Sequence, residues 1–389
     1  MSHKILHKIL RYGDYQQVKS IHIKFNKDDT DVRYEKTHDN PEDLVIAKES
    51  QDTILNEIKE ILKTEEEIIE HRYCKIKDKN WHLSFNISII NTGEGKKIII
   101  DLVKKSSTVL KINKLGLESK QLKNLLSTIK NESGLIIIAG YYNSGKSTLF
   151  YSLLNEINDP NKNIVSIEKV REQNIVGVSQ ILIDKNTGFK YNNAIDNALK
   201  QNSEVIAIDE LNKDNVNNIF RAASATKLVL TSLNSSDSIS VIERLQTMGI
   251  SPSKIAENVK LIITPRILDL NCPHCAKKYE ISEEGKMDIK HIMGKRILNK
   301  MPSVIYKSKG CARCNYSRHQ GCTGVFEFFN ISPAIKQAIL GKATYEEIEK
   351  IAKAEGFSSL EDNTIIKIKN GLISIDEVIK KSPKGDIKL

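Results

Sequence analysis

An eight-residue turn at 140–147, Gly-Tyr-Tyr-Asn-Ser-Gly-Lys-Ser, restricts the possible folds of this chain more than any other segment. The apolar run Leu135–Ala139 before it predicts a buried strand, and the amphipathic stretch Thr148–Ile157 after it predicts a helix. A strand that enters a helix through G-x-x-x-x-G-K-S is the signature of a phosphate-binding loop. The alternative, a chance match in a glycine-containing turn, is disfavoured by the flanking elements. We therefore predict an α/β fold with this loop at the end of a buried strand.

The residue types in the loop suit a triphosphate. Glycines let the backbone curl so that its N–H groups point at phosphate oxygens, and the N-terminus of the following helix adds positive potential. Lys146 is expected to reach the terminal phosphates, and the Ser147 hydroxyl to coordinate Mg²⁺. We therefore expect ATP and Mg²⁺ as ligands. The residues expected to bind the nucleotide in this loop are Gly140, Asn143, Ser144, Gly145, Lys146, Ser147 and Thr148.

Two acids, Asp209 and Glu210, follow a second apolar run, Val205–Ile208. A strand that ends in two carboxylates places acid at the edge of the sheet next to the phosphate loop, where it can hold Mg²⁺ and water. The alternative is a strand that simply ends in solvated acids. The presence of the phosphate loop earlier in the chain favours the metal-binding interpretation.

From Gly134 onwards, strand patterns alternate with helical ones, which is typical of a mainly parallel sheet. The further strands expected here are Ile164–Glu168, Val205–Ile208, Leu228–Thr231 and Lys260–Thr264. This part of the chain, 134–389, is expected to be the ATP-binding domain. Its last region, 331–389, predicts helices. Capping boxes mark their starts at Thr344 with Glu347, Ser358 with Glu361 and Ser374 with Glu377.

Residues 1–112 predict a separate N-terminal domain of mixed α/β type. Its helix is expected from about Gln51 to His71, and residues 113–133 are expected to form a polar, helix-like linker. The short alternating segments that predict strands in this domain are Ser20–Phe25, His82–Ile90 and Lys97–Val103.

Four of the six cysteines form two C-x-x-C pairs, within a module expected over 271–323. Each pair can bind a tetrahedral Zn²⁺ from a tight turn, and four thiolates leave no open position for water, so the site would be structural. The gap between the pairs exceeds the ~15–20 residues of the commonest ribbon pattern, so a small hairpin or helical module must lie between them. The alternative is four thiols without metal. The expected zinc ligands are Cys272, Cys275, Cys311 and Cys314.

The chain carries 59 basic and 49 acidic residues, a net charge of +10, which suits an anionic partner without choosing among nucleotide, nucleic acid and acidic lipid. No basic stripe is interleaved with aromatic residues, so specific nucleic-acid binding is not expected. No apolar run approaches the ~18 residues of a membrane span, and the first residues have helical spacing unlike a signal peptide. These observations predict a cytoplasmic protein.

Several further segments, taken in order, resemble the assembly ATPases of type II secretion systems and type IV pili. Ile167–Glu172 is similar to the acidic box I-E-D-P-V-E of that family, and Leu228–Asp237 is similar to its L-V-L-S-T-L-H-T-N-D. Arg244–Gly249 resembles R-L-x-x-M-G, and Pro265–Cys275 resembles Q-R-L-V-R-x-L-C-P-x-C. The likeness runs from about Ser20 to Ser382.

The resemblance implies a RecA-type P-loop core, a PAS-like N-terminal domain and the zinc module of the extension-type members. It implies a homohexamer that couples ATP hydrolysis to an inner-membrane platform protein, and thus peripheral association with the inner membrane, to drive assembly of a pilus or pseudopilus. It also implies that Glu168 activates water, with Glu210 as the second acid, on the Mg²⁺ side. The arginines that could reach a nucleotide, in the same subunit or across a subunit boundary, are Arg33, Arg72, Arg244 and Arg266.

This chain departs from the family pattern at several positions. Lys169 and Val170 replace Asp and Pro of the acidic box, and Lys227 and Asn234 replace two histidines. Two arginines of the family's N-terminal region are also replaced in this chain. Arginines near a transferred phosphoryl group stabilise the developing charge, so their loss lowers the rate. The departures therefore keep a second hypothesis open, an ATP-binding regulatory or scaffold subunit that hydrolyses ATP weakly. A third hypothesis, a nucleic-acid-handling motor, is motivated only by the basic charge.

Overall fold

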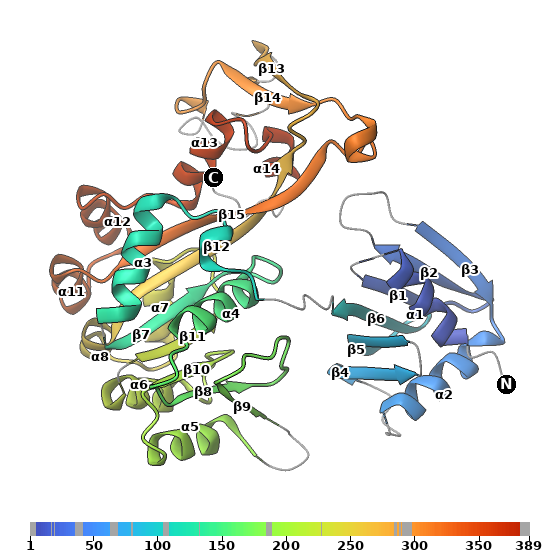
Figure 1. Ribbon diagram of the computed structural model, residues 1–389, viewed down its shortest axis with the longest axis horizontal. Helices are drawn as coiled ribbons and strands as arrows, with labels where there is room; N and C mark the ends of the chain where they lie inside the picture. Colours follow the sequence, from blue (N-terminus) through green and yellow to red (C-terminus); the bar gives the residue numbers. More distant parts are fainter. Residues whose placement is uncertain are drawn as a thin grey trace. The chain divides into compact units, whose positions relative to one another are not determined.

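The computed structural model divides into two compact units, Met1–Ser107 and Thr108–Leu389 (Figure 1). Each unit is considered by itself. The residues that the structure describes are 5–16, 18, 20–35, 42–62, 69–78, 81–103, 109–131, 133–183, 189–226, 228–283, 286–287, 289 and 298–381. None of the helices in these ranges combines the length and the apolar composition that a bilayer crossing requires.

The N-terminal unit is an antiparallel sheet of six strands in the order β3-β2-β1-β6-β5-β4, with two helices packed against it. Alternate residues of β5, such as Phe85 and Ile87, are buried together with Leu6 of α1 and Ile54 of α2, because strand side chains alternate between faces. The expected mixed α/β character is confirmed. The elements are α1 (Ile5–Tyr15), β1 (Ser20–Phe25), β2 (Asp29–Glu35), β3 (Glu42–Ala47), α2 (Ser50–Leu62), β4 (Ile69–Asp78), β5 (Trp81–Thr92) and β6 (Gly95–Val103).

The helix expected from Gln51 to His71 is shorter than predicted, because α2 ends at Leu62 and residues 69–71 belong to β4. The physical reason is pairing with β5, which provides hydrogen-bond partners for the backbone of β4. The buried Cys74 and Ile76 of β4 lie two residues apart, which is the strand period.

The C-terminal unit is built on a seven-stranded sheet in the order β15-β12-β7-β11-β10-β8-β9, in which only β15 runs antiparallel to its neighbour. This confirms the mainly parallel sheet. The strands are β7 (Gly134–Ala139), β8 (Ile164–Glu168), β9 (Ser179–Leu182), β10 (Val205–Ile208), β11 (Leu228–Leu233), β12 (Val259–Asn271) and β15 (His319–Asn330).

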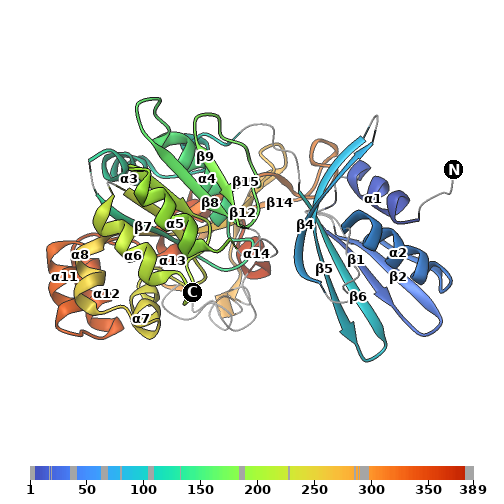
Figure 2. The same cartoon turned by 90° about the horizontal axis from the view of Figure 1, so that it is seen from below.

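Helices cover both faces of this sheet (Figure 2). Leu135 and Ile137 of β7 pack into one apolar cluster and Ile136 and Ile138 into the other, as expected for a strand buried on both faces. The first cluster includes α5 (Tyr191–Lys200), α6 (Val216–Ala225), α7 (Ser240–Thr247), α8 (Pro252–Asn258), α11 (Pro333–Leu340) and α12 (Tyr345–Ala354). The second includes α3 (Ser119–Asn131) and α4 (Lys146–Ile157).

Residues 113–133, expected as a linker, belong to the C-terminal unit. Leu125 and Ile129 of α3 are buried in its second cluster, and Gln121 Nε2 donates to Phe326 O at 2.9 Å. Most residues of α3 are polar, but Leu122, Leu125 and Ile129 form an apolar stripe at helical spacing. Leu122 packs against the same cluster as the two buried residues. The segment is therefore part of the core layer.

We expect Leu125→Ala to lower the free energy of unfolding of the C-terminal unit by about 2–5 kcal/mol, because the substitution leaves a cavity in a closed core. Chemical denaturation measures the loss. Lys123→Ala, at an exposed position of the same helix, is the matched control and should change little. Equal small effects of the two substitutions would restore the linker interpretation.

The three helices near the predicted capping boxes each begin at a side-chain cap. The box at Thr344 is confirmed, whereas the box expected at Ser358 and Glu361 lies one residue later, at Ser359 and Asp362. Ser359 is in the extended conformation that an N-cap requires. The helices with their caps are α12 after Thr344, α13 (Leu360–Lys369) after Ser359 and α14 (Ile375–Lys380) after Ser374.

Candidate nucleotide site and metal centre

The phosphate loop leaves the carboxyl end of β7 and enters α4 through two positive-φ residues, Asn143 at 61° and Gly145 at 101°. Gly145 is required by its left-handed backbone, and a side chain at either loop glycine would be crowded. A Cβ at Gly140 would lie 2.4 Å from Ser144 Oγ, and one at Gly145 would lie 2.9 Å from Ile267 Cγ1 of β12. The loop is thus curled tightly against β12, with the first turn of α4 beginning at Lys146.

The Lys146 ammonium is held inside the loop, where Nζ donates to Gly140 O at 2.7 Å and to Tyr141 O at 2.8 Å. Burial lowers the pKa of Lys146, and the charge of Glu210 opposes that shift. Ser144 Oγ is buried and has no hydrogen-bond partner among the described residues. A partly desolvated cation beside an unused hydroxyl fits a phosphate group, which would be a stronger acceptor than a carbonyl.

The two acids after β10 have different surroundings. Glu210 Oε2 accepts from Lys169 Nζ at 2.5 Å, and Glu210 is close enough to Lys146 to act on its charge. Asp209 instead accepts from Tyr191 OH at 2.5 Å and from the backbone of Lys169 at 2.6 Å. Burial raises the pKa of Asp209 to about 6. Asp209 therefore connects the end of β10 to α5 and to the residue after β8. Glu210 is the acid close to Lys146 of the phosphate loop.

Glu168, expected to activate water, is fully buried. Its carboxylate accepts from Tyr151 OH, from Ser166 Oγ at 2.5 Å and from Gln180 Nε2 at 3.0 Å. The period of a strand gives the reason: Ser166 and Glu168 lie two residues apart on β8, so both side chains point to the face covered by α4. This placement differs from the expected one, since the carboxylate is enclosed by protein groups.

Glu172 is the acid that contacts the phosphate loop. Ser147 Oγ donates to Glu172 Oε1 at 3.0 Å. Glu172 is an exposed residue, but the protein groups around its carboxylate partly desolvate it and raise its pKa. Glu172 is the last position of the acidic box, and the family resemblance implies no separate role for it. The available signal was the second glutamate of that box, four residues beyond the strand end at Glu168.

Two of the expected arginines, Arg244 and Arg266, belong to the same unit as the loop. Arg266 on β12 is the one beside it, because Tyr141 is among the groups that act on its charge while burial lowers the pKa of Arg266. Arg244 is exposed on α7. Arg33, in the N-terminal unit, donates two hydrogen bonds to Asp43, at 2.7 and 3.0 Å.

Two of the sequence-based interpretations concern groups outside the described residues. The side chain of Arg72 is one, although its backbone belongs to β4, and Lys227 is the other. Asn234, at the position of the second replaced histidine, is exposed at the end of β11.

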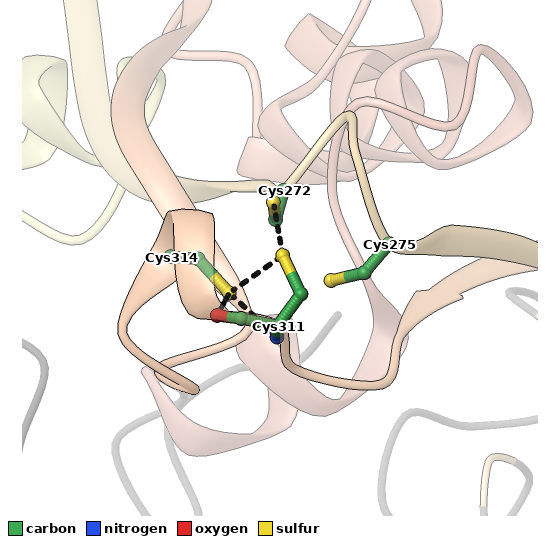
Figure 3. A group of neighbouring side chains, drawn as sticks. All are labelled: Cys272, Cys275, Cys311 and Cys314. Carbon is green, nitrogen blue, oxygen red and sulfur yellow. Dashed lines mark hydrogen bonds between the residues drawn. The ribbon is translucent and has the colours of Figure 1, made fainter.

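The four cysteines of the two C-x-x-C pairs converge, with their ligand atoms all within 4.8 Å of one another (Figure 3). The sulfur of Cys311 lies 3.9 Å from that of Cys272 and 3.8 Å from that of Cys314. Tetrahedral Zn–S bonds of ~2.3 Å place sulfurs about 3.8 Å apart, so the group fits a zinc ion. Hydrogen bonds to backbone carbonyls and amides at each pair close the turns, as for Ala276 N to Cys272 O at 2.9 Å.

Of the two alternatives expected between the pairs, a hairpin or a helical module, the structure shows a hairpin. β13 (Ala276–Glu280) starts directly after the first pair, and β14 (Val304–Ser308), antiparallel to it, ends just before the second. The whole module sits between β12 and β15.

A family model described as Type II/IV secretion system protein matches residues 1–380. The type II secretion system ATPase E of Vibrio cholerae is 28% identical over 295 residues, covering 76% of this chain and 57% of that protein. The type IV pilus assembly ATPase PilB of Pseudomonas aeruginosa is 28% identical over 323 residues, covering 83% and 56%. The chain thus spans little more than half the length of these relatives.

Two solved structures share the fold over nearly the whole chain. The ATPase DotB of Legionella pneumophila superposes with a TM-score of 0.65 at 14% identity, covering 97% of this chain and 95% of DotB. The pilus retraction motor PilT with bound ADP superposes with a TM-score of 0.63 at 17% identity, covering 98% of each chain.

Proposed function

This chain belongs to the type II/IV secretion system protein family, and on that premise we propose that it is an ATP-hydrolysing motor subunit of a secretion or pilus assembly machine. The observation that carries the proposal is the contact of Glu172 with Ser147 in the phosphate loop. A carboxylate at that place can position and deprotonate the water that attacks the terminal phosphate.

The residues around the loop have separate roles in binding the nucleotide and its metal ion. Lys146 neutralises phosphate charge, and the loop N–H groups together with the first turn of α4 bind the phosphate oxygens. Ser147 and Glu210 are the oxygen donors that would hold Mg²⁺, which neutralises charge on the phosphates when bound. Arg266 is the cation beside the loop that could reach the nucleotide. The tetracysteine group would hold Zn²⁺ in a structural role.

The proposal extends to assembly. We expect six copies to form a ring, bound peripherally at the inner membrane through a platform protein. The support is the ordered likeness of motifs to the assembly ATPases and the pilus-assembly and secretion functions named for the relatives.

One observation favours a second candidate, the ATP-binding subunit with weak hydrolysis. Lys169 stands where the resembling family has an acid, and its ammonium is paired with Glu210. Release of phosphate by the purified chain, with its oligomeric mass measured by light scattering, separates the two candidates. A turnover near 1 s⁻¹ or above suits a motor, and binding without turnover suits the regulatory subunit.

We expect Lys146→Ala to weaken the binding of an ATP analogue by roughly 2 kcal/mol or more, about thirtyfold, because it removes the cation that pairs with the terminal phosphates. Isothermal titration calorimetry with Mg²⁺ present measures the loss. Lys162→Ala, at a partly exposed lysine beyond the end of α4, is the control and should bind normally. Failure of the unchanged chain to bind the analogue would remove the proposed function altogether.

A further inference from the structure

Hydrogen bonds made by Tyr151 and by the backbone and side chain of Glu172 connect the buried Glu168 carboxylate to the phosphate loop. Tyr151 of α4 donates its hydroxyl hydrogen to Glu168, and the same hydroxyl oxygen accepts from the backbone N–H of Glu172 at 2.9 Å. The Glu172 carboxylate then accepts from Ser147. A single phenol therefore joins the enclosed acid to the acid that faces the loop.

The direction of these bonds is fixed by chemistry. Burial raises the pKa of Tyr151 far above its ordinary value, and the charge of Glu168 raises it further, so the phenol keeps its proton. A phenol has one hydrogen to donate, and Glu168 takes it. The oxygen lone pairs are left to accept, and the N–H of Glu172 supplies that hydrogen bond.

Gln180 of β9 provides a second connection from the same carboxylate to this segment. Its Nε2 donates both to Glu168 Oε1 at 3.0 Å and to Gln173 O at 2.9 Å, and its Oε1 accepts from Ile175 N at 3.0 Å. Together, Tyr151 and Gln180 bind backbone groups of three residues between 172 and 175. Since residues 171–178 form no helix or strand, side chains must provide what a regular element would provide through its backbone.

We propose that Tyr151, anchored on Glu168, is a positioning residue that holds the backbone of Glu172 so that its carboxylate stays against the phosphate loop. This inference rests on the proposed function of Glu172. It also assigns a role to the buried Glu168, whose carboxylate fixes the side chains of Tyr151 and Gln180 that bind the backbone of residues 172–175. The tyrosine acts through Glu172 and does not touch the nucleotide.

Packing and positioning can be separated at Tyr151 because its ring and its hydroxyl do different things. The ring lies in the apolar cluster under α4, edge-on to Phe150 with 5.5 Å between ring centroids. Tyr151→Phe keeps that ring and removes only the hydroxyl. Ser152→Ala is the matched control, because Ser152 is the next residue of the same helix and its buried hydroxyl has no partner among the described residues.

Tyr151→Phe in the full chain should lower kcat by about 10- to 100-fold, since a small misplacement of a reacting group can cost that much, with analogue affinity changed less than about twofold. Ser152→Ala should keep both values. Combining Tyr151→Phe with Glu172→Gln should add little to the loss from Glu172→Gln alone, because both changes act through one carboxylate. An unchanged kcat in Tyr151→Phe, or losses that multiply in the double variant, would overturn the inference.

Hydrogen exchange read by mass spectrometry decides the question even if the chain hydrolyses no ATP. Peptides covering residues 172–175 should exchange several-fold faster in Tyr151→Phe than in the unchanged chain or in Ser152→Ala. Unaltered exchange there would refute the positioning role. Absence of hydrolysis in the unchanged chain, with faster exchange in Tyr151→Phe, would instead contradict the proposed function and leave the positioning role standing.

Discussion

Glu172→Gln is expected to lower the rate of ATP hydrolysis by about 10²- to 10⁴-fold, the contribution typical of a general base. The amide has the shape of the carboxylate but cannot accept the proton of the attacking water. Nucleotide binding should persist, because Lys146 and the loop backbone are untouched. Phosphate release and titration of an ATP analogue, measured on the same preparation, report the two quantities separately.

The matched control is Glu156→Gln, which makes the same chemical change at an exposed position of α4. Its rate should stay within about twofold of the unchanged chain, as is usual for surface substitutions. If both substitutions leave the rate intact, Glu172 has no part in the chemistry.

The pH dependence of kcat/KM, which reports groups of the nucleotide-free enzyme, provides an independent test of the same residue. Partial desolvation by neighbouring protein groups raises the pKa of the exposed Glu172, and only the ionised carboxylate accepts a proton. Activity should therefore be present above the raised pKa and lost as the pH falls through it, at a pH above the ordinary range of a glutamate. In Glu172→Gln the residual rate should lack this acidic limb. A limb that persists in the variant would assign it to another group.

Loss of the metal is expected to unfold the module between β12 and β15. The β13–β14 hairpin is a two-stranded sheet, which is marginal by itself, whereas zinc bound by thiolates contributes an apparent ~10–16 kcal/mol in zinc-finger peptides. We predict one zinc ion per chain and near-complete loss of it in Cys314→Ser. Elemental analysis measures the metal, and limited proteolysis should then cut within residues 272–318.

Cys322→Ser is the control for that experiment, since Cys322 is exposed on β15 and outside the cluster. It should retain the metal and resist the protease. Well-folded protein without zinc, or with zinc equally retained in both variants, would contradict the assignment.

The sequence allowed correct prediction of the central strands and the loop for a physical reason. Strands buried on both faces, such as β7 and β10, read as unbroken apolar runs, and a phosphate loop needs its residues contiguous in the chain. The zinc-binding cysteine pairs could also be predicted, because the two thiols of each pair must lie in one turn and are therefore close in the sequence.

The position of Glu172 beside the phosphate loop could not be predicted from the sequence in the same way. It lies in a stretch without helix or strand periodicity, and its place depends on Tyr151 and Gln180, which come from two other elements. The family resemblance assigns the activation of water to Glu168, at the end of β8. Its burial under α4 follows from tertiary packing, which a strand pattern alone does not contain.

Errors in the extent of elements have a similar origin. The end of α2 depends on β4 pairing with β5, and the role of α3 depends on a core assembled from distant strands. Both are non-local contacts, and both override the local polar or helical pattern.

The pairing of β12 with β15 has a consequence for how such a chain can change over evolution. Asn271 and His319 are partners across the two strands, so the zinc-binding module leaves the sheet and re-enters it at the same point. An insertion whose two ends are neighbours can be exchanged, shortened or acquired as a cassette without rerouting the polypeptide elsewhere. Ile305 of the module packs into the apolar cluster beneath α13. A replacement module would have to reproduce these contacts.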